Sequence, residues 1–231
     1  MRQIQNYGDT RQQAFCAYCG SNIATRDHVP PKVFLDTPYP SNLPLVSSCF
    51  DCNNHSSIDE EYTACLIERI LSGSVEPCEI GREKIKRIIA EKPALASRLA
   101  RAKQITEQGI IFNAEIDRVH RVILKLARGH ASYEINEPQI DMPRNIFAIP
   151  RPLFSDEERF LFDNPANSSG TIALWPEVGS RAMQRLLTYA EESYPWIHVQ
   201  KGRYRYMVDM EDRVTVKIVI SEYLYCCVEW D

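Results

Sequence analysis

The first quarter of the chain contains two pairs of cysteines with the spacing of metal ligands. Cys16 and Cys19 form one CxxC pair, and Cys49 and Cys52 form the other. We call each pair a cysteine knuckle. Four thiolates at these spacings suit the tetrahedral coordination of a structural zinc ion. Because sulfur would fill all four coordination positions, we expect this zinc ion to support folding rather than to bind a substrate.

Side chains of a different kind lie between and beside these pairs. Asp27 and His28 are adjacent, and Asn53 directly follows the last cysteine. A carboxylate and an amide oxygen suit a hard divalent cation, and a neutral imidazole can act as a general base. Adjacent side chains on a strand face opposite ways, so we expect Asp27 to face the cation and His28 to face water. This combination suits phosphodiester hydrolysis.

The order of these residues resembles the HNH endonuclease family, in the group whose ββα-metal core also binds a structural zinc ion. The resemblance covers about residues 15–61. It implies two strands and a helix around one catalytic Mg²⁺ or Mn²⁺ ion, with DNA as the expected substrate. By position, Asp27 and Asn53 would bind this ion and His28 would activate water. Asn42 resembles the residue that braces the loop and orients the general base.

Three more residues near the motif are candidates for contact with phosphate. Many members of the family have a basic residue soon after the last knuckle, where this chain has His55. We expect His55 to donate to phosphate or to act as an additional metal ligand. Arg26 and Lys32 are also candidates, although solvated loop residues are the ordinary interpretation of both.

The bulk composition is that of an ordinary globular protein. The chain has 231 residues, of which 44% are hydrophobic and 25% charged, and its formal net charge is −4. This charge argues against a protein coated in positive charge for non-specific binding of nucleic acid. The first residues lack the apolar core of a signal peptide, and no stretch approaches the roughly 20 apolar residues of a membrane span. We therefore expect a cytoplasmic protein, in which paired cysteines bind metal rather than form disulfides.

The other four cysteines follow no ligand pattern. We expect Cys65, Cys78, Cys226 and Cys227 to be small buried apolar residues. Because Cys226 and Cys227 are adjacent in a run that alternates like a strand, they should point to opposite faces of a sheet.

The patterning predicts an α+β chain in three parts: a treble-clef-like, zinc-bound ββα-metal module over 1–75, a helical region over 76–150 and a β-rich region over 151–231. In the first part, a capping-box pattern at 57–60 predicts a helix that begins there and ends near Leu71. Further helices are predicted over 80–105, 113–128, 155–162 and 179–192, and strands over 171–175, 204–208, 214–220 and 223–230, with turns at 211–212 and 221–222.

The helix predicted over 113–128 should end at Gly129. It has an apolar face and, on the opposite side, four cations: Arg118, Arg121, Lys125 and Arg128. Such a stripe can follow a phosphate backbone, so this face is the candidate surface for duplex DNA, against the simpler interpretation of a solvated helix face.

Three other functions remain open from the sequence. The first is a non-catalytic zinc module that binds nucleic acid or protein, in which Asp27, His28 and Asn53 have no chemical role. The second is a nuclease that acts on RNA, since the HNH core does not use the 2′-hydroxyl. A cysteine-nucleophile enzyme built on Cys65 or Cys78 is the weakest, because neither has a suitable His–Asn arrangement. The C-terminal region is the candidate surface for a protein partner or a homo-oligomer.

Overall fold

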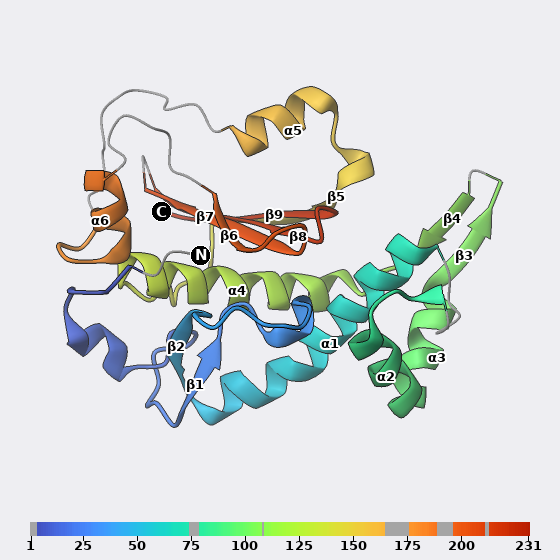
Figure 1. The fold of residues 1–231 in the computed structure, drawn as a ribbon, viewed down its shortest axis with the longest axis horizontal. Helices are drawn as coiled ribbons and strands as arrows, with labels where there is room; N and C mark the ends of the chain where they lie inside the picture. Colours follow the sequence, from blue (N-terminus) through green and yellow to red (C-terminus); the bar gives the residue numbers. More distant parts are fainter. Residues whose placement is uncertain (1–3, 74–78, 108, 165–175, 189–195, 211–212) are drawn as a thin grey trace.

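The computed structural model describes residues 4–73, 79–107, 109–164, 176–188, 196–210 and 213–231. Its described part is a mixed α+β fold with six α-helices and a C-terminal antiparallel sheet (Figure 1). The helices are α1 Phe50–Ser72, α2 Glu83–Glu91, α3 Pro93–Ala102, α4 Ile116–Ile135, α5 Asp156–Asp163 and α6 Arg181–Thr188. The strands are β1 Thr25–His28, β2 Leu45–Ser48, β3 Lys103–Thr106, β4 Gly109–Phe112, β5 Asn145–Pro150, β6 Ile197–Gln200, β7 Tyr204–Asp209, β8 Val214–Ile220 and β9 Leu224–Trp230.

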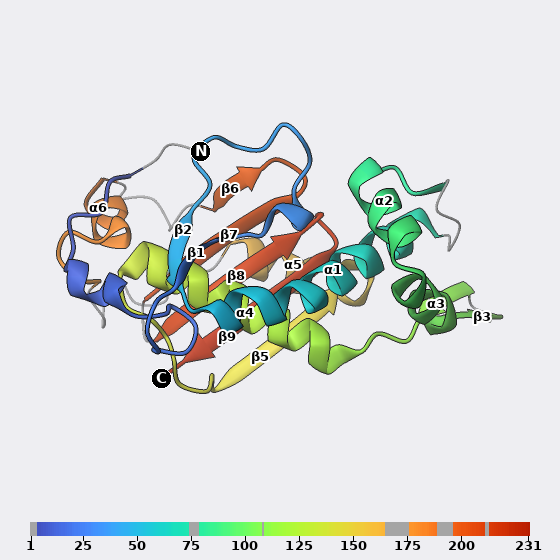
Figure 2. The ribbon, with the colours of Figure 1, turned by 90° about the horizontal axis from the view of Figure 1, so that it is seen from below.

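The five-stranded sheet has the order β5-β9-β8-β7-β6, and every neighbouring pair is antiparallel. Helix α4 packs along one face of this sheet, and α1 and the β1–β2 hairpin lie on the far side of α4 (Figure 1). Seen from below, α1 and α4 cross the strands side by side, while α2 and α3 lie at one end (Figure 2). Helix α5 covers the opposite face of the sheet (Figure 1). The α4 layer therefore connects the cysteine-rich hairpin to the sheet.

The predicted C-terminal meander is confirmed in β7, β8 and β9. Ser221 and Glu222 form the last turn, with φ angles of 54° and 47°. Cys226 belongs to the main core beneath α4, whereas Cys227 belongs to a second cluster under α5. The two cysteines thus point to opposite faces, as the period of the strand requires. Cys65 is also buried, as predicted.

Helix α1 begins earlier than the capping-box pattern predicted. Its N-cap is Cys49, whose Sγ accepts a hydrogen bond from the backbone N–H of Cys52 at 3.3 Å. The prediction of a start near Ser57 was wrong because a sulfur atom, rather than a serine hydroxyl, satisfies the first free N–H groups. The C-terminal end is close to the prediction, since Gly73 caps α1 with a φ of 67°.

Helix α4 ends later than predicted, because it continues through Gly129 to a left-handed C-cap at Asn136. A Cβ atom on Gly129 would lie 2.7 Å from Cγ2 of Val29, the residue after His28. Gly129 is therefore not a helix stop but the point of closest approach between α4 and the end of β1. A glycine has both uses, and the sequence alone does not distinguish them.

Two further elements were missed. The stretch predicted as helical over 80–105 contains α2 and α3 but ends in the β3–β4 hairpin, where Ile105 is 82% exposed rather than part of an apolar helix face. Strand β5 lies in the region predicted to be helical and pairs with β9. Its strand character depends on a partner some eighty residues away in the sequence, which local periodicity does not reveal.

The remaining predictions are confirmed or lie outside the described residues. Helix α5 has a capping box at Ser155, and α6 falls within the predicted range 179–192. The strand predicted over 171–175, the turn at 211–212 and Cys78 are outside the described residues. None of the described helices has the length and apolar character needed to cross a membrane.

A buried histidine links α4 to the sheet. His130 is fully buried, its Nε2 lies 2.8 Å from the Tyr204 hydroxyl, and its ring stacks on Tyr206 at 3.7 Å between centroids. Its Nδ1 has no hydrogen-bond partner among the described residues. Burial lowers the pKa of His130 well below its ordinary value, so the folded protein keeps this ring neutral.

The buried neutral His130 predicts a loss of stability at acid pH. The unfolded chain protonates this ring below about pH 6.5, whereas the folded chain does not, so unfolding is favoured as the pH falls. Between pH 7.5 and 5.5 the wild type should lose about 1.3 kcal/mol more unfolding free energy than His130→Gln, which does not titrate. Urea denaturation measures this difference, from which effects common to both proteins cancel. Equal losses in the two proteins would contradict the assignment.

The contact between Gly129 and Val29 predicts an unusual result for a glycine inside a helix. Gly129→Ala should lower the unfolding free energy by about 1–3 kcal/mol, because the steric clash outweighs the helix propensity of alanine. Gly81→Ala is the matched control, since a Cβ atom there would meet nothing within 4 Å. Stabilisation by Gly129→Ala in chemical denaturation would show that α4 does not approach Val29 closely.

Candidate metal centre and active site

The cysteine pairs flank a two-stranded hairpin that leads directly into a helix. Strands β1 and β2 are antiparallel, with Asp27 opposite Val46 and His28 opposite Leu45. The first cysteine pair precedes β1, and the second lies at the start of α1. Hydrogen bonds from Ala17 N to Ser47 O and from Ala24 N to Ser48 O join the first knuckle to β2. The fold therefore brings the two knuckles together.

The four cysteine side chains converge on one point. The sulfur atoms of Cys16, Cys19, Cys49 and Cys52 all lie within 4.8 Å of one another, and those of Cys19 and Cys49 are 3.8 Å apart. Tetrahedral zinc with Zn–S bonds of about 2.3 Å requires sulfur–sulfur distances of about 3.8 Å. The geometry fits a zinc ion, so the predicted metal-binding cluster is present.

The surroundings lower the pKa values of Cys19 and Cys49, whereas burial raises the pKa values of Cys16 and Cys52. The backbone N–H of Cys52 donates to Cys49 at the N-terminus of α1 and lowers the pKa of Cys49 to about 6. From α4, Arg128 donates to the backbone carbonyl of Tyr18 in the first knuckle at 2.9 Å, and its charge lies near the sulfur atoms. A guanidinium group in this place offsets part of the negative charge of a metal bound by four thiolates.

Asp27 is buried in an ion pair that the sequence did not predict. Its Oδ2 accepts a hydrogen bond from the Tyr18 hydroxyl at 3.1 Å and lies 2.7 Å from Nζ of Lys125 on α4. The same ammonium group lies 2.7 Å from Oε1 of Glu60 on α1. The side chains of Asp27, Glu60 and Lys125 are only 11%, 8% and 8% exposed. We call these three residues the buried charge triad.

The triad keeps Lys125 charged. Burial alone would lower the pKa of Lys125, but attraction to Glu60 and Asp27 outweighs burial and raises it. The sequence placed Glu60 in a capping-box pattern and Lys125 in a cationic stripe, and neither pattern predicts a buried ion pair. The only signal was the position of Lys125 on a helix whose other face is apolar.

Asn53 faces β1 from the first turns of α1. Its Nδ2 donates to Oγ1 of Thr25 at 3.3 Å. Thr25 and Asp27 are two residues apart on the strand and share one face, and Asn53 and Glu60 are seven apart on the helix and share one face. Asn53 and Asp27 therefore lie on facing surfaces of α1 and β1.

His28 is the last residue of β1, and its side chain lies on the opposite face of the strand from that of Asp27. Burial lowers the pKa of His28, and the charge of nearby Lys32 acts in the same direction. Its Nδ1 is buried without a hydrogen-bond partner among the described residues. The ring also interacts with the backbone of Pro44, which lies in the segment just before β2. The lowered pKa favours the neutral ring, the form in which an imidazole can act as a general base.

The other two predicted catalytic residues are placed differently. Asn42 is half-buried in the turn before β2, three residues before Leu45, which pairs with His28. His55 is exposed on α1. It is two residues after Asn53, about 200° around the helix, so the structure does not bring His55 to the face that carries Asn53.

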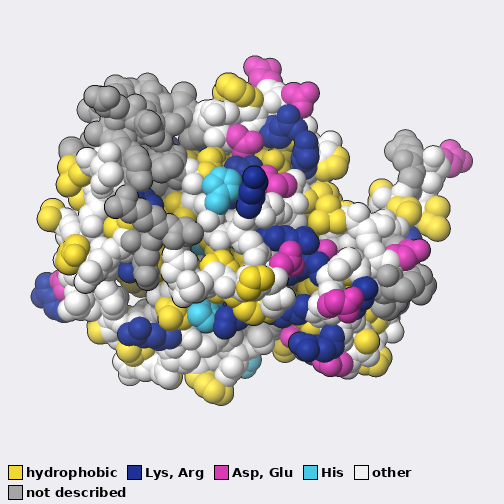
Figure 3. Space-filling view, viewed as in Figure 1, with side chains coloured by type: hydrophobic (Ala, Val, Ile, Leu, Met, Phe, Trp, Pro, Cys, Tyr) yellow, Lys and Arg dark blue, Asp and Glu magenta, His cyan; other side chains and the backbone are white. Residues whose placement is uncertain are grey.

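The cationic face of α4 is not the open surface that the sequence predicted. Arg118 and Arg121 both pair with Asp59 of α1, at 3.1 and 2.9 Å. Lys125 belongs to the buried charge triad, and Arg128 binds backbone carbonyls. Acids on α1, which helix periodicity does not reveal, thus pair with three of the four cations of the stripe. Cations and acids are also interleaved over much of the face shown in Figure 3.

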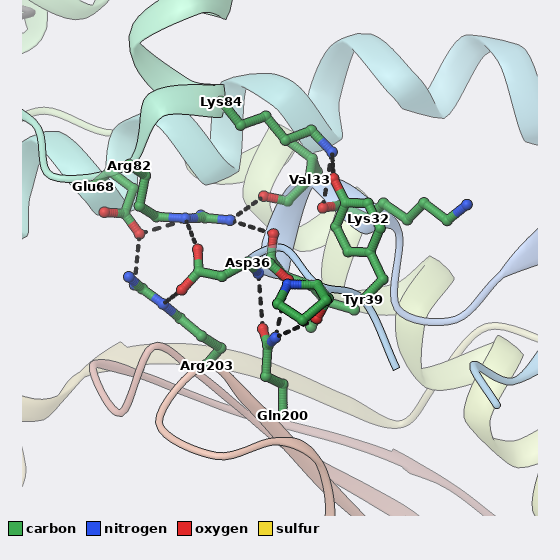
Figure 4. A network of polar contacts seen from close by, with 11 residues as sticks. Lys32, Val33, Asp36, Tyr39, Glu68, Arg82, Lys84, Gln200 and Arg203 are labelled. Atoms are coloured by element: carbon green, nitrogen blue, oxygen red, sulfur yellow. Dashed lines mark hydrogen bonds and ion pairs between the residues drawn. The ribbon is translucent and has the colours of Figure 1, made fainter. Parts of the chain in front are cut away.

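A second polar network braces the connection between β1 and β2 (Figure 4). Arg82, which is buried, donates to Asp36 at 2.6 Å and to the carbonyls of Val33 and Leu35. Arg203, from the turn before β7, donates to the other oxygen of Asp36 at 2.5 Å. The connection that follows His28 is therefore held by both α2 and the C-terminal sheet.

Removing one ligand tests the cysteine cluster. Cys19→Ser should reduce bound zinc from about one ion per chain to well below one, and should lower the Tm by more than about 10 °C, because zinc binding contributes to folding. Cys19 is exposed, so the substitution disturbs no core packing. Cys65→Ala, at a buried cysteine outside the cluster, is the control and should retain zinc. Metal analysis measures the zinc content of each variant. A content of about one zinc ion per chain in Cys19→Ser would exclude the four cysteines as the ligand set.

No protein-family model matches this chain. Comparisons with curated proteins and with solved structures also found no match. A functional proposal therefore rests on the residues of the site and their geometry.

Proposed function

We propose that this chain is a metal-dependent endonuclease of the HNH type that hydrolyses phosphodiester bonds in DNA. His28 is the general base, Asp27 and Asn53 bind a catalytic Mg²⁺ or Mn²⁺ ion, and the four-cysteine cluster binds structural zinc. The β1–β2 hairpin followed by α1 serves as the ββα-metal core. The observation that carries the proposal is the convergence of the four sulfur atoms next to this hairpin, with Asp27 and His28 on β1 and Asn53 facing β1 from α1.

The donor chemistry fits a hard divalent ion. Among the described residues, the polar contacts of Asp27 involve Oδ2 and the side-chain contact of Asn53 uses Nδ2, which leaves Oδ1 of each side chain for a cation. Carboxylate and amide oxygens are the usual protein ligands of Mg²⁺. When bound, such an ion supplies a positive charge that neutralises the phosphate in the transition state.

The chain's own residues supply the remaining chemistry. His28 accepts a proton from the attacking water at its imidazole ring, and the lowered pKa of the ring favours the neutral form that this requires. The backbone hydrogen bond from Val29 N to Pro44 O, at 3.0 Å, holds the end of β1 against the opposite segment. Asn42 lies in that segment and braces it.

A second candidate function has one specific observation in its favour. The ammonium group of Lys125 already neutralises Asp27, as it would in a module that uses this carboxylate only to support packing. In this alternative the chain is a non-catalytic zinc module that binds nucleic acid or protein, and His28 has no chemical role.

The nuclease proposal is tested by incubating purified protein with supercoiled plasmid in the presence of Mg²⁺, Mn²⁺ or EDTA. We expect nicking that needs the added cation and that falls by at least about 10²-fold in His28→Ala, because a general base contributes about that much. His198→Ala, at an exposed histidine of β6, is the matched control and should cut like the wild type.

His55→Ala, assayed in parallel, measures any contribution of this exposed residue to phosphate binding. An RNA substrate in the same assay distinguishes the two nucleic acids. If the wild type leaves DNA intact with either cation, or if His28→Ala cuts as well as the wild type, the proposal is wrong and the non-catalytic module is favoured.

A further inference from the structure

The buried charge triad contains a resident cation next to the proposed site of a divalent ion. One ammonium group, from Lys125, lies 2.7 Å from both the Asp27 and the Glu60 carboxylates. Lys125 also lies 5.1 Å from the ring centroid of Tyr18, between the two cysteines of the first knuckle. All three charged side chains are almost fully shielded from water. The two carboxylates carry one more negative charge than the lysine neutralises.

A structural ion pair and a competing cation have opposite consequences for metal binding. If Lys125 only holds Asp27 in place, its loss loosens the carboxylate and weakens the binding of a divalent ion. If the ammonium group competes for Asp27, its loss removes a positive charge from the immediate neighbourhood of the ion. In a buried site, repulsion between a divalent ion and an ammonium group a few ångströms away is poorly screened.

We propose that Lys125 is a positioning residue that acts as a built-in counter-cation: it keeps Asp27 and Glu60 paired when no divalent ion is bound, and it lowers the affinity of the site for that ion. This inference rests on the proposed metal site at Asp27 and Asn53. Glu60 also binds the ammonium group, so it retains Lys125 when a cation engages Asp27. The chain would then fold without the catalytic ion and bind it weakly.

The test is a titration of zinc-loaded, full-length protein with Mn²⁺, followed by the electron paramagnetic resonance signal of free Mn²⁺. Lys125→Met should bind Mn²⁺ at least about tenfold more tightly than the wild type, because one repelling charge is removed. Glu60→Gln should bind Mn²⁺ several-fold more weakly, since Lys125 then forms an ion pair with Asp27 alone. Asp27→Asn identifies the site and should abolish the binding.

Each outcome decides the inference. Weaker or unchanged Mn²⁺ binding by Lys125→Met, with zinc content and circular dichroism unaltered, would assign Lys125 a structural role and overturn the proposal. So would unchanged or tighter binding by Glu60→Gln. If Lys125→Met does not fold, the double variant Glu60→Gln/Lys125→Met, which removes one charge of each sign, decides in its place and should also bind Mn²⁺ more tightly than the wild type.

The result is independent of the nuclease assay. One outcome is that the wild type binds Mn²⁺ at Asp27, with tighter binding in Lys125→Met and weaker binding in Glu60→Gln, and yet does not nick DNA. This result would refute the proposed activity and leave the role of Lys125 intact. A wild type that nicks DNA but shows no tightening in Lys125→Met would refute the role of Lys125 and leave the activity intact.

Discussion

The arrangement of the N-terminal region depends on one constraint, the convergence of four sulfur atoms from two distant knuckles. The first knuckle precedes β1, and the second provides the N-cap and first turn of α1. A tetrahedral ion between them would fix the helix N-terminus relative to the hairpin, in a segment whose apolar side chains are buried against the rest of the chain. The facing positions of Asp27 on β1 and Asn53 on α1 follow from this constraint.

The rest of the chain completes this region from outside it. Helix α4 contributes Arg128 to the first knuckle, Lys125 to Asp27 and Gly129 to the contact with Val29. The sheet in turn holds α4, in part through the stacked ring of His130. Through Arg203, the same sheet also fixes the connection that follows β1. Helix α4 and the contact of Arg203 therefore both relate the candidate site to the C-terminal sheet, and the hydrophobic core is continuous from Cys16 to Trp230.

Features encoded locally were predictable from the sequence, whereas features that depend on distant partners were not. Spacing predicted the cysteine cluster, and period-two alternation predicted β7 to β9 and the opposite faces of Cys226 and Cys227. Strand β5 and the closed triad around Lys125 each require a partner far away in the sequence. The cationic stripe was misread for the same reason, because Asp59 and Glu60 on another helix pair with three of its four cations.

The most direct test of this account is a crystal structure of the zinc-loaded chain soaked in Mn²⁺, with anomalous difference maps collected at the zinc and manganese edges. The account predicts one zinc peak among the four cysteine sulfur atoms and one manganese peak bound by the Asp27 carboxylate and the Asn53 side-chain oxygen, with His28 nearby. A zinc peak elsewhere, or manganese bound only at sites that exclude Asp27 and Asn53, would contradict it.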